Sequence, residues 1–192
     1  MTVSGPGPVA RQRPKSSAVS GYYEWVETLI STLVVVMVIS VFLFRLNVVV
    51  EGTSMEPNYL NGYHVFVNCV DRGFRRGDVV VIDADGTKLG KRIIKRVIAT
   101  EAQKVDIDFA KGIVMVDGKK LDESAYIQNG ITKRQGSTRF PLTVAPGKVF
   151  VLGDNRPVSE DSRFEDVGEI DARYIMGKVS FLLSPFKGFR SP

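Results

Sequence analysis

A 20-residue apolar window near the N-terminus constrains this 192-residue chain more than any other feature. In Trp25–Phe44, 15 of the 20 residues are apolar. A helix rises about 1.5 Å per residue, so 20 helical residues span roughly 30 Å, the thickness of the hydrocarbon core of a bilayer. Tyr22 and Tyr23 stand where interfacial aromatic side chains are common. The window predicts a transmembrane helix over residues 22–46.

Two other interpretations of the window compete with a retained span. A buried helix of a soluble protein would be shorter or would carry a polar stripe. A cleaved secretory signal peptide has a shorter apolar stretch and a small-residue cleavage site, whereas this window ends in Phe42-Leu43-Phe44-Arg45. We therefore predict a single-pass protein of the cell membrane, with the lipid bilayer as one partner.

The residues before the window predict its orientation. Residues 1–21 are rich in Gly, Pro and Ser, and their charged side chains are Arg11, Arg13 and Lys15. This composition predicts a disordered basic tail, and the positive-inside rule places it in the cytoplasm. Arg45, beyond the window, opposes this bias slightly. Residues 47–192 are then an extracytoplasmic domain.

Composition removes several classes of function. The chain has one Cys and one His, which excludes an internal disulfide, a four-Cys metal site and any site that needs two imidazoles. The net charge of +5 mildly favours anionic surfaces, but it is too small to indicate nucleic acid binding when anionic lipid serves equally well.

The chain beyond the window is rich in short β-branched runs separated by turn residues. No long amphipathic helix and no internal repeat follow the window, so we predict a mainly β domain with a coiled antiparallel or barrel-like sheet. We interpret residues 105–145 as a β-ribbon insertion or cap. The predicted strands are Val48–Val50, Tyr63–Val70, Asp78–Ile82, Arg92–Ala99, Gly112–Val116, Gly147–Leu152 and Met176–Leu182.

The single histidine and the single cysteine do not suggest a catalytic pair. Strand alternation puts His64 on one face of its strand and Cys69 on the other. We interpret His64 as an ordinary strand residue and Cys69 as a small core side chain.

A serine that a lysine activates is the alternative nucleophile. Ser54 lies between Gly52, which permits close backbone approach, and Pro57, which turns the chain. This spacing suits a nucleophile at a strand-to-turn junction, although an ordinary polar turn has the same composition.

Lys95 is the matching candidate for a general base. In a strand, Lys95 shares its face with Ile93 and Val97, whose apolar side chains would favour the neutral amine. A lysine whose ammonium reaches the surface from a buried stem is the competing interpretation.

A third polar cluster covers Gly153–Arg163 and follows an apolar strand directly. Asp154 and Asp161 can pair there with Arg156 or Arg163, and such networks brace functional sites. Taken alone, the cluster is also consistent with a plain polar loop.

Together these segments resemble the bacterial type I signal peptidases, a family of membrane-anchored Ser-Lys endopeptidases. The resemblance covers about residues 25–182, and its specificity lies in the order of the motifs behind a membrane span. The matching motifs are Gly52–Pro57, Arg76–Val81, Ile94–Ile98 and Gly153–Arg163.

The resemblance implies a role for each polar residue of the motifs. Ser54 would be the nucleophile, Lys95 the general base, and Ser159 the residue that orients the Lys95 amine. Asp161 and Arg163 would form a supporting ion pair, and Asp154 and Arg156 would stabilise their loop. These seven positions all lie within the matching motifs.

The resemblance implies only part of the substrate site and of the oxyanion hole. Met55, Ile93 and Ile94 are expected to line the substrate site, with pockets for small residues. Some members carry a serine two residues before the nucleophile that helps to form the oxyanion hole, but this chain has Gly52 there. The Ser54 backbone N–H is then the one donor that the resemblance identifies.

The implied function is removal of signal peptides from secreted preproteins through an acyl-enzyme, without a metal or organic cofactor. One alternative is a membrane-anchored, catalytically inactive β-domain that binds a partner. Another is a soluble Ser-Lys self-cleaving protein of the repressor type, against which the apolar window argues.

Overall fold

The computed structural model of the chain describes residues 17–45, 47–83, 90–127, 131–184 and 188–190. The chain divides into two compact units, Met1–Phe44 and Arg45–Pro192.

The first unit is built on one long helix, α1 (Ser17–Arg45). Its segment Gly21–Ser40 has a mean hydropathy of 1.5 and is long enough to cross a membrane. Inside the apolar segment, the Thr28 and Thr32 hydroxyls donate to the carbonyl oxygens four residues earlier, at 2.8 and 2.7 Å. Such bonds satisfy polar groups within the helix itself.

The helix begins earlier than the sequence predicted. Residues 1–16 of the expected basic tail lie outside the described residues, but 17–21 are helical rather than part of a tail. No proline stands between Pro14 and Pro57, so nothing in the backbone stops the helix from extending toward the N-terminus.

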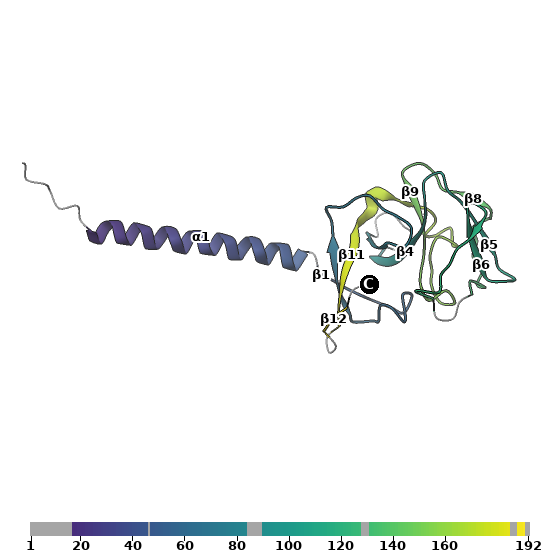
Figure 1. Cartoon of the computed structure of the whole chain (residues 1–192), viewed down its shortest axis with the longest axis horizontal. Helices are drawn as coiled ribbons and strands as arrows, with labels where there is room; N and C mark the ends of the chain where they lie inside the picture. The colour runs from purple at the N-terminus through teal and green to yellow at the C-terminus, as the bar shows by residue number, and fades with distance from the viewer. Residues whose placement is uncertain (1–16, 46, 84–89, 128–130, 185–187, 191–192) are drawn as a thin grey trace, which may run out of the picture. The chain divides into compact units, whose positions relative to one another are not determined.

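The second unit contains two antiparallel sheets (Figure 1). The larger runs in the order β1-β2-β11-β3-β4-β9-β10, and β12 pairs with β11. Its strands are β1 (Asn47–Val49), β2 (His64–Asn68), β3 (Val79–Ile82), β4 (Ile93–Thr100), β9 (Lys148–Leu152), β10 (Ile170–Asp171), β11 (Ile175–Ser184) and β12 (Gly188–Arg190). Register shifts in β4 and β11 increase the local twist and bend of these strands.

Residues 104–143 supply the smaller sheet, which was expected as a ribbon or cap. Its order is β7-β6-β5-β8. The strands are β5 (Lys104–Asp108), β6 (Ile113–Val116), β7 (Lys119–Lys120) and β8 (Leu142–Thr143). Figure 1 shows β5, β6 and β8 on one side of this unit and β1, β11 and β12 on the other, with β4 and β9 between. The predicted fold class, mainly β with antiparallel sheets behind one apolar helix, is confirmed.

The core encloses β4 from both faces. Ile93 and Val97 pack in one buried cluster with residues of β3 and β9, while Ile94 packs in another with Val50 and Met55. Ile98 joins a third cluster that lies between the two sheets. Lys95, between these residues of β4, is therefore flanked by hydrocarbon from both clusters.

The prediction for Cys69 is wrong, because β2 ends one residue before it. The Asn68 side chain accepts the backbone N–H of Val70 at 3.0 Å, which closes a turn. Cys69 consequently leaves the sheet, and its side chain is exposed rather than in the core.

Candidate active site

Ser54 lies in the connection between β1 and β2, and backbone hydrogen bonds fix the base of this connection. Val50 N–H donates to the Tyr63 carbonyl oxygen at 2.7 Å. Gly52 has φ +84°, in the region that favours glycine, and its N–H donates to Asn61 Oδ1 at 2.9 Å. Met55, next to the serine, is 1% exposed and anchors the turn in the core.

Lys95 lies within hydrogen-bond distance of Ser54. Its Nζ donates to Ser54 Oγ at 2.8 Å and to the Ile94 carbonyl oxygen at 3.2 Å. The residue is 3% exposed. Burial lowers the Lys95 pKa to about 8, although the nearby Asp161 carboxylate partly opposes this shift. A substantial fraction of the amine is therefore neutral close to physiological pH.

Asn155 ties the polar loop Gly153–Arg163 to the turn that carries Ser54, residues 52–57, which we name the serine turn. The sequence did not assign this role to Asn155. Its backbone N–H donates to the Ser54 carbonyl oxygen at 3.0 Å, and its Nδ2 donates to the Thr53 carbonyl oxygen at 3.0 Å. An amide shortly after a buried strand was visible in the sequence, but no neighbouring residue indicated which group it would bond.

The expected contact between Ser159 and Lys95 is not formed. Ser159 is fully buried, and its Oγ has no hydrogen-bond partner among the described residues. Its N–H donates to the Asn155 carbonyl oxygen, and this tight turn sets the hydroxyl against the backbone of Gly153. The structure therefore gives Ser159 a place beside the site, but not the bond to the amine.

The expected ion pair between Asp161 and Arg163 is present. Arg163 Nε donates to Asp161 Oδ1 at 2.8 Å, and both side chains are fully buried. Asp161 Oδ2 also accepts the Gly153 N–H at 3.0 Å. A buried pair with these additional bonds fixes the two ends of the loop against each other.

The pairing foreseen for Asp154 within its own loop is wrong. Asp154 accepts two bonds from Arg96 of β4, at 2.8 and 2.7 Å, and one from Asn58 at 2.8 Å. Arg156 instead pairs with Glu123, which lies beyond β7. Neither Arg96 nor Glu123 had been assigned to the site. Arg96 stands inside the lysine motif, on the strand face opposite Lys95, and could have been found there. No motif or pattern around Glu123 indicates that this residue belongs to the site.

A cleft of about 360 Å³ opens beside Ser54 and Lys95. Of the three residues predicted to contact substrate, Ile93 and Ile94 line this cleft, but Met55 does not, because it packs into the core beneath the serine turn. The cleft is lined by Glu51, Gly52, Thr53, Ser54, Lys91, Arg92, Ile93, Ile94, Lys95, Val158 and Glu160.

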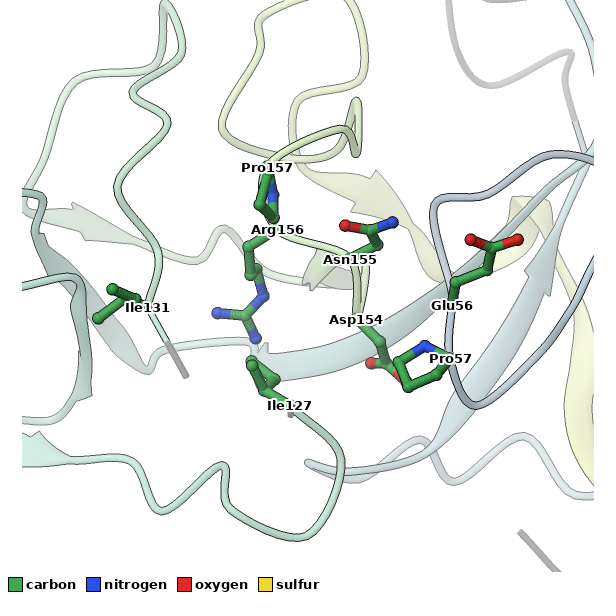
Figure 2. A pocket seen from close by; sticks show the side chains of 8 residues that line it. All are labelled: Glu56, Pro57, Ile127, Ile131, Asp154, Asn155, Arg156 and Pro157. Atoms are coloured by element: carbon green, nitrogen blue, oxygen red, sulfur yellow. The ribbon is translucent and has the colours of Figure 1, made fainter. Parts of the chain in front are cut away.

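A second cavity, of about 230 Å³, lies against the same polar loop. Figure 2 shows its lining, with the Arg156 side chain reaching from the loop toward Ile127 and Ile131. The other lining residues are Glu56, Pro57, Asp154, Asn155 and Pro157. The loop is thus packed between the serine turn and the connection that joins β7 to β8.

Metal-ligating side chains do not gather within the described ranges. No group of three or more His, Cys, Asp or Glu residues there could hold a metal ion. His64 lies near Asn47, with 3.1 Å between its Nδ1 and Asn47 Oδ1.

Comparison with known proteins identifies the family of the chain. A family model described as signal peptidase, peptidase S26, matches residues 22–184. Signal peptidase I of Bacillus licheniformis is 34% identical over 176 residues, which cover 88% of this chain and 91% of the relative. Signal peptidase IB of Staphylococcus aureus strain COL is 33% identical over 184 residues, covering 87% and 92%.

A solved structure is also similar. The crystal structure of a signal peptidase I from Enterococcus faecalis V583 is 28% identical, with a TM-score of 0.43, and covers 55% of this chain and 96% of that chain.

The protein is therefore a serine endopeptidase of the class that removes signal peptides. The chain belongs to the signal peptidase family, peptidase S26, and the relatives it matches are type I enzymes. The predicted family and type of activity are confirmed.

Proposed function

We propose that this chain cleaves signal peptides from secreted preproteins with Ser54 as nucleophile and Lys95 as general base. The observation that carries the proposal is the 2.8 Å contact between Lys95 Nζ and Ser54 Oγ. A general base must lie within hydrogen-bond reach of the proton that it removes, and its pKa must lie near the working pH. Burial brings the pKa of Lys95 toward that range.

The reaction runs through an acyl-enzyme. Neutral Lys95 takes the Ser54 hydroxyl proton as Oγ attacks the scissile carbonyl carbon, and the Ser54 backbone N–H is the expected donor to the oxyanion. The Lys95 ammonium then protonates the leaving amine, and the peptide bond breaks. The neutral amine next removes a proton from the water that attacks the ester carbonyl carbon, and the Lys95 ammonium returns that proton to Ser54 Oγ as the acyl–oxygen bond breaks.

The cleft favours an extended substrate with small apolar side chains. Ile93 and Ile94 supply apolar lining beside Ser54. In the register of the larger sheet, β9 pairs with β4 from Arg96 onward, so the preceding residues of β4 offer a backbone edge at the cleft. A preprotein segment that adds to this edge would present its scissile carbonyl to the serine.

The helix α1 anchors the enzyme in the cell membrane, with the N-terminus in the cytoplasm and residues 47–192 outside as the catalytic domain. Confining enzyme and preprotein to one membrane raises their effective concentration. An inactive, partner-binding domain of the same fold would not need a buried lysine against a serine hydroxyl, so the Ser54–Lys95 contact favours the enzyme.

Cleavage of a preprotein by the purified chain in detergent tests the proposal. Ser54→Ala and Lys95→Ala are each expected to abolish cleavage, because each removes one partner of the 2.8 Å contact. Thr143→Ala, which removes a hydroxyl from an exposed position of β8, is the matched control and keeps full activity. Cleavage at the wild-type rate by either site variant would disprove the mechanism.

A further inference from the structure

The polar loop Gly153–Arg163, named here the catalytic loop, is held by the connection between β7 and β8 of the smaller sheet. This segment, named here the cap segment, comprises residues 121–127 and 131–138 and follows β7. It contacts the catalytic loop through both side chains and backbone. The two segments lie far apart in the sequence, so their contacts depend entirely on how the two sheets pack.

The backbone of the catalytic loop is bonded to the cap segment at several points. Arg134 Nη1 donates to the Ser159 carbonyl oxygen at 3.2 Å, and Arg163 Nη1 donates to the Arg134 carbonyl oxygen at 2.8 Å. Thr138 Oγ1 donates to the Ser162 carbonyl oxygen at 2.9 Å. These bonds brace the part of the loop that follows Ser159.

The part of the loop nearest Ser54 is held by a buried charge pair. Glu123 accepts two hydrogen bonds from Arg156, at 2.5 Å from Nη2 and 3.2 Å from Nη1, and Thr132 Oγ1 accepts another from Nη1. The Arg156 side chain is 1% exposed and that of Glu123 is 9% exposed. A bidentate pair of this kind fixes both the position and the orientation of the guanidinium.

Arg156 passes this constraint to the residues around the serine. Its Nε donates to the Gly153 carbonyl oxygen at 2.9 Å. Gly153 packs directly against Ser159 and the Ser54 carbonyl oxygen, and the neighbouring Asn155 holds that same oxygen at 3.0 Å. A short chain of direct contacts therefore leads from Glu123 to the nucleophile.

We propose that Glu123 is a positioning residue for the Ser54–Lys95 pair, acting through Arg156 and the catalytic loop. The inference rests on the proposed function. Without its carboxylate partner, Arg156 is a buried charge that must reach water or another acceptor, and such a charge moves the backbone that carries it. The catalytic loop would then move away from the serine turn, and water would reach the Lys95 amine.

The test compares the full-length variants Glu123→Gln and Glu123→Asp with the matched control Glu169→Gln. Glu169 is also a partly buried glutamate that accepts a backbone N–H, from Ala145 at 2.8 Å, but it contacts neither the catalytic loop nor the serine turn in any described hydrogen bond. Preprotein cleavage in detergent gives kcat, KM and the pH profile, and thermal unfolding reports whether each variant is folded.

We expect Glu123→Gln to lower kcat by about 10²-fold with KM changed by less than about threefold, because displacement of a reacting group by about 1 Å costs that much. Glu123→Asp keeps the charge and is expected to recover most of kcat. The ascending limb of the pH profile should move to higher pH in Glu123→Gln, because water that reaches Lys95 relieves its desolvation. The charged groups that face Lys95, namely Asp154, Glu160, Asp161 and Lys91, are unchanged in these variants.

A double-variant cycle separates positioning from a general loss of stability. If Glu123 acts through Arg156, kcat of Glu123→Gln/Arg156→Gln equals that of Arg156→Gln alone. Additive losses, or a folded Glu123→Gln with the kcat and pH profile of Glu169→Gln, would overturn the inference. If Glu123→Gln does not fold, Glu123→Asp decides: a small fall in kcat below that of Glu169→Gln with unchanged KM supports the inference, and a kcat equal to that of Glu169→Gln overturns it. Activity in Ser54→Ala or Lys95→Ala would instead refute the proposed function, whatever Glu123→Gln does.

Discussion

Burial of the Lys95 side chain lowers the stability of the fold and at the same time favours the proposed chemistry. Its amine is almost completely buried, and the surrounding hydrocarbon lowers its pKa from 10.5 to about 8. Below pH 8 the folded protein must hold a buried ammonium, which costs free energy of folding. The same burial supplies the neutral base that the proposed mechanism needs.

Lys95→Met should therefore abolish cleavage and stabilise the fold. Methionine fills similar space without a charge, so we expect the free energy of unfolding at pH 7 to rise by about 1–3 kcal/mol. Between pH 8 and 10.5 the unfolded wild type binds the proton more tightly than the folded protein, so wild-type stability rises with pH and the difference from Lys95→Met shrinks. Urea unfolding at pH 7 and pH 10 measures this. A variant that is less stable at pH 7 would contradict the desolvation account.

The sequence could predict the roles of some single residues of the site but not the partners of others. Ser54 and Lys95 could be proposed because their motifs are local and alternation in a strand places Lys95 between Ile93 and Val97. The pairing of Arg156 with Glu123 could not, because the partners stand 33 positions apart and meet only when the two sheets pack. Local spacing favoured partners inside the loop, and tertiary packing supplied others.

Among the elements, the catalytic loop depends on the absence of a side chain at Gly153. A Cβ there would lie 2.6 Å from the Ser54 carbonyl oxygen and closer still to Ser159 Oγ. Real Cβ atoms do not approach backbone so closely, so the loop and the serine turn would have to separate.

Gly153→Ala is expected to lower kcat at least about tenfold and to destabilise the fold by about 1–3 kcal/mol. Gly73→Ala is the matched control, since its added methyl group would meet only the Asp71 side chain, at 3.3 Å. Preprotein cleavage and thermal unfolding measure both effects. Wild-type kcat in Gly153→Ala would show that the loop and the serine turn are not in close contact.

The strands followed the sequence where β-branched residues are concentrated, as in β3 and β9. The sequence prediction missed β5, β7, β8, β10 and β12. In β5 the charged residues Lys104, Asp106 and Asp108 alternate with buried valine and isoleucine, and charge lowers intrinsic strand preference. Strands of two residues, such as β8 and β10, exist only because a neighbouring strand supplies hydrogen bonds, which a local pattern cannot report.

At the scale of the whole molecule, the proposed topology puts the β unit outside the cell membrane. The chain has a single cysteine, Cys69, and its side chain is exposed. It is therefore a native probe for the side of the membrane on which the β unit lies.

A membrane-impermeant maleimide should label Cys69 in intact cells, and Cys69→Ser should remove the label. Exposure of the thiol makes the reaction possible, and the topology makes the reagent able to reach it. Labelling that requires permeabilised cells would place residues 47–192 in the cytoplasm and contradict the proposed orientation.

The pH dependence of kcat/KM for preprotein cleavage tests the central claim, that a desolvated Lys95 activates Ser54, most directly. Activity requires the neutral amine, so it should fall as pH drops through the Lys95 pKa of about 8 and level off above it. An ascending limb near the ordinary lysine pKa of 10.5, or wild-type cleavage at pH 9 by Lys95→Ala, would contradict the account.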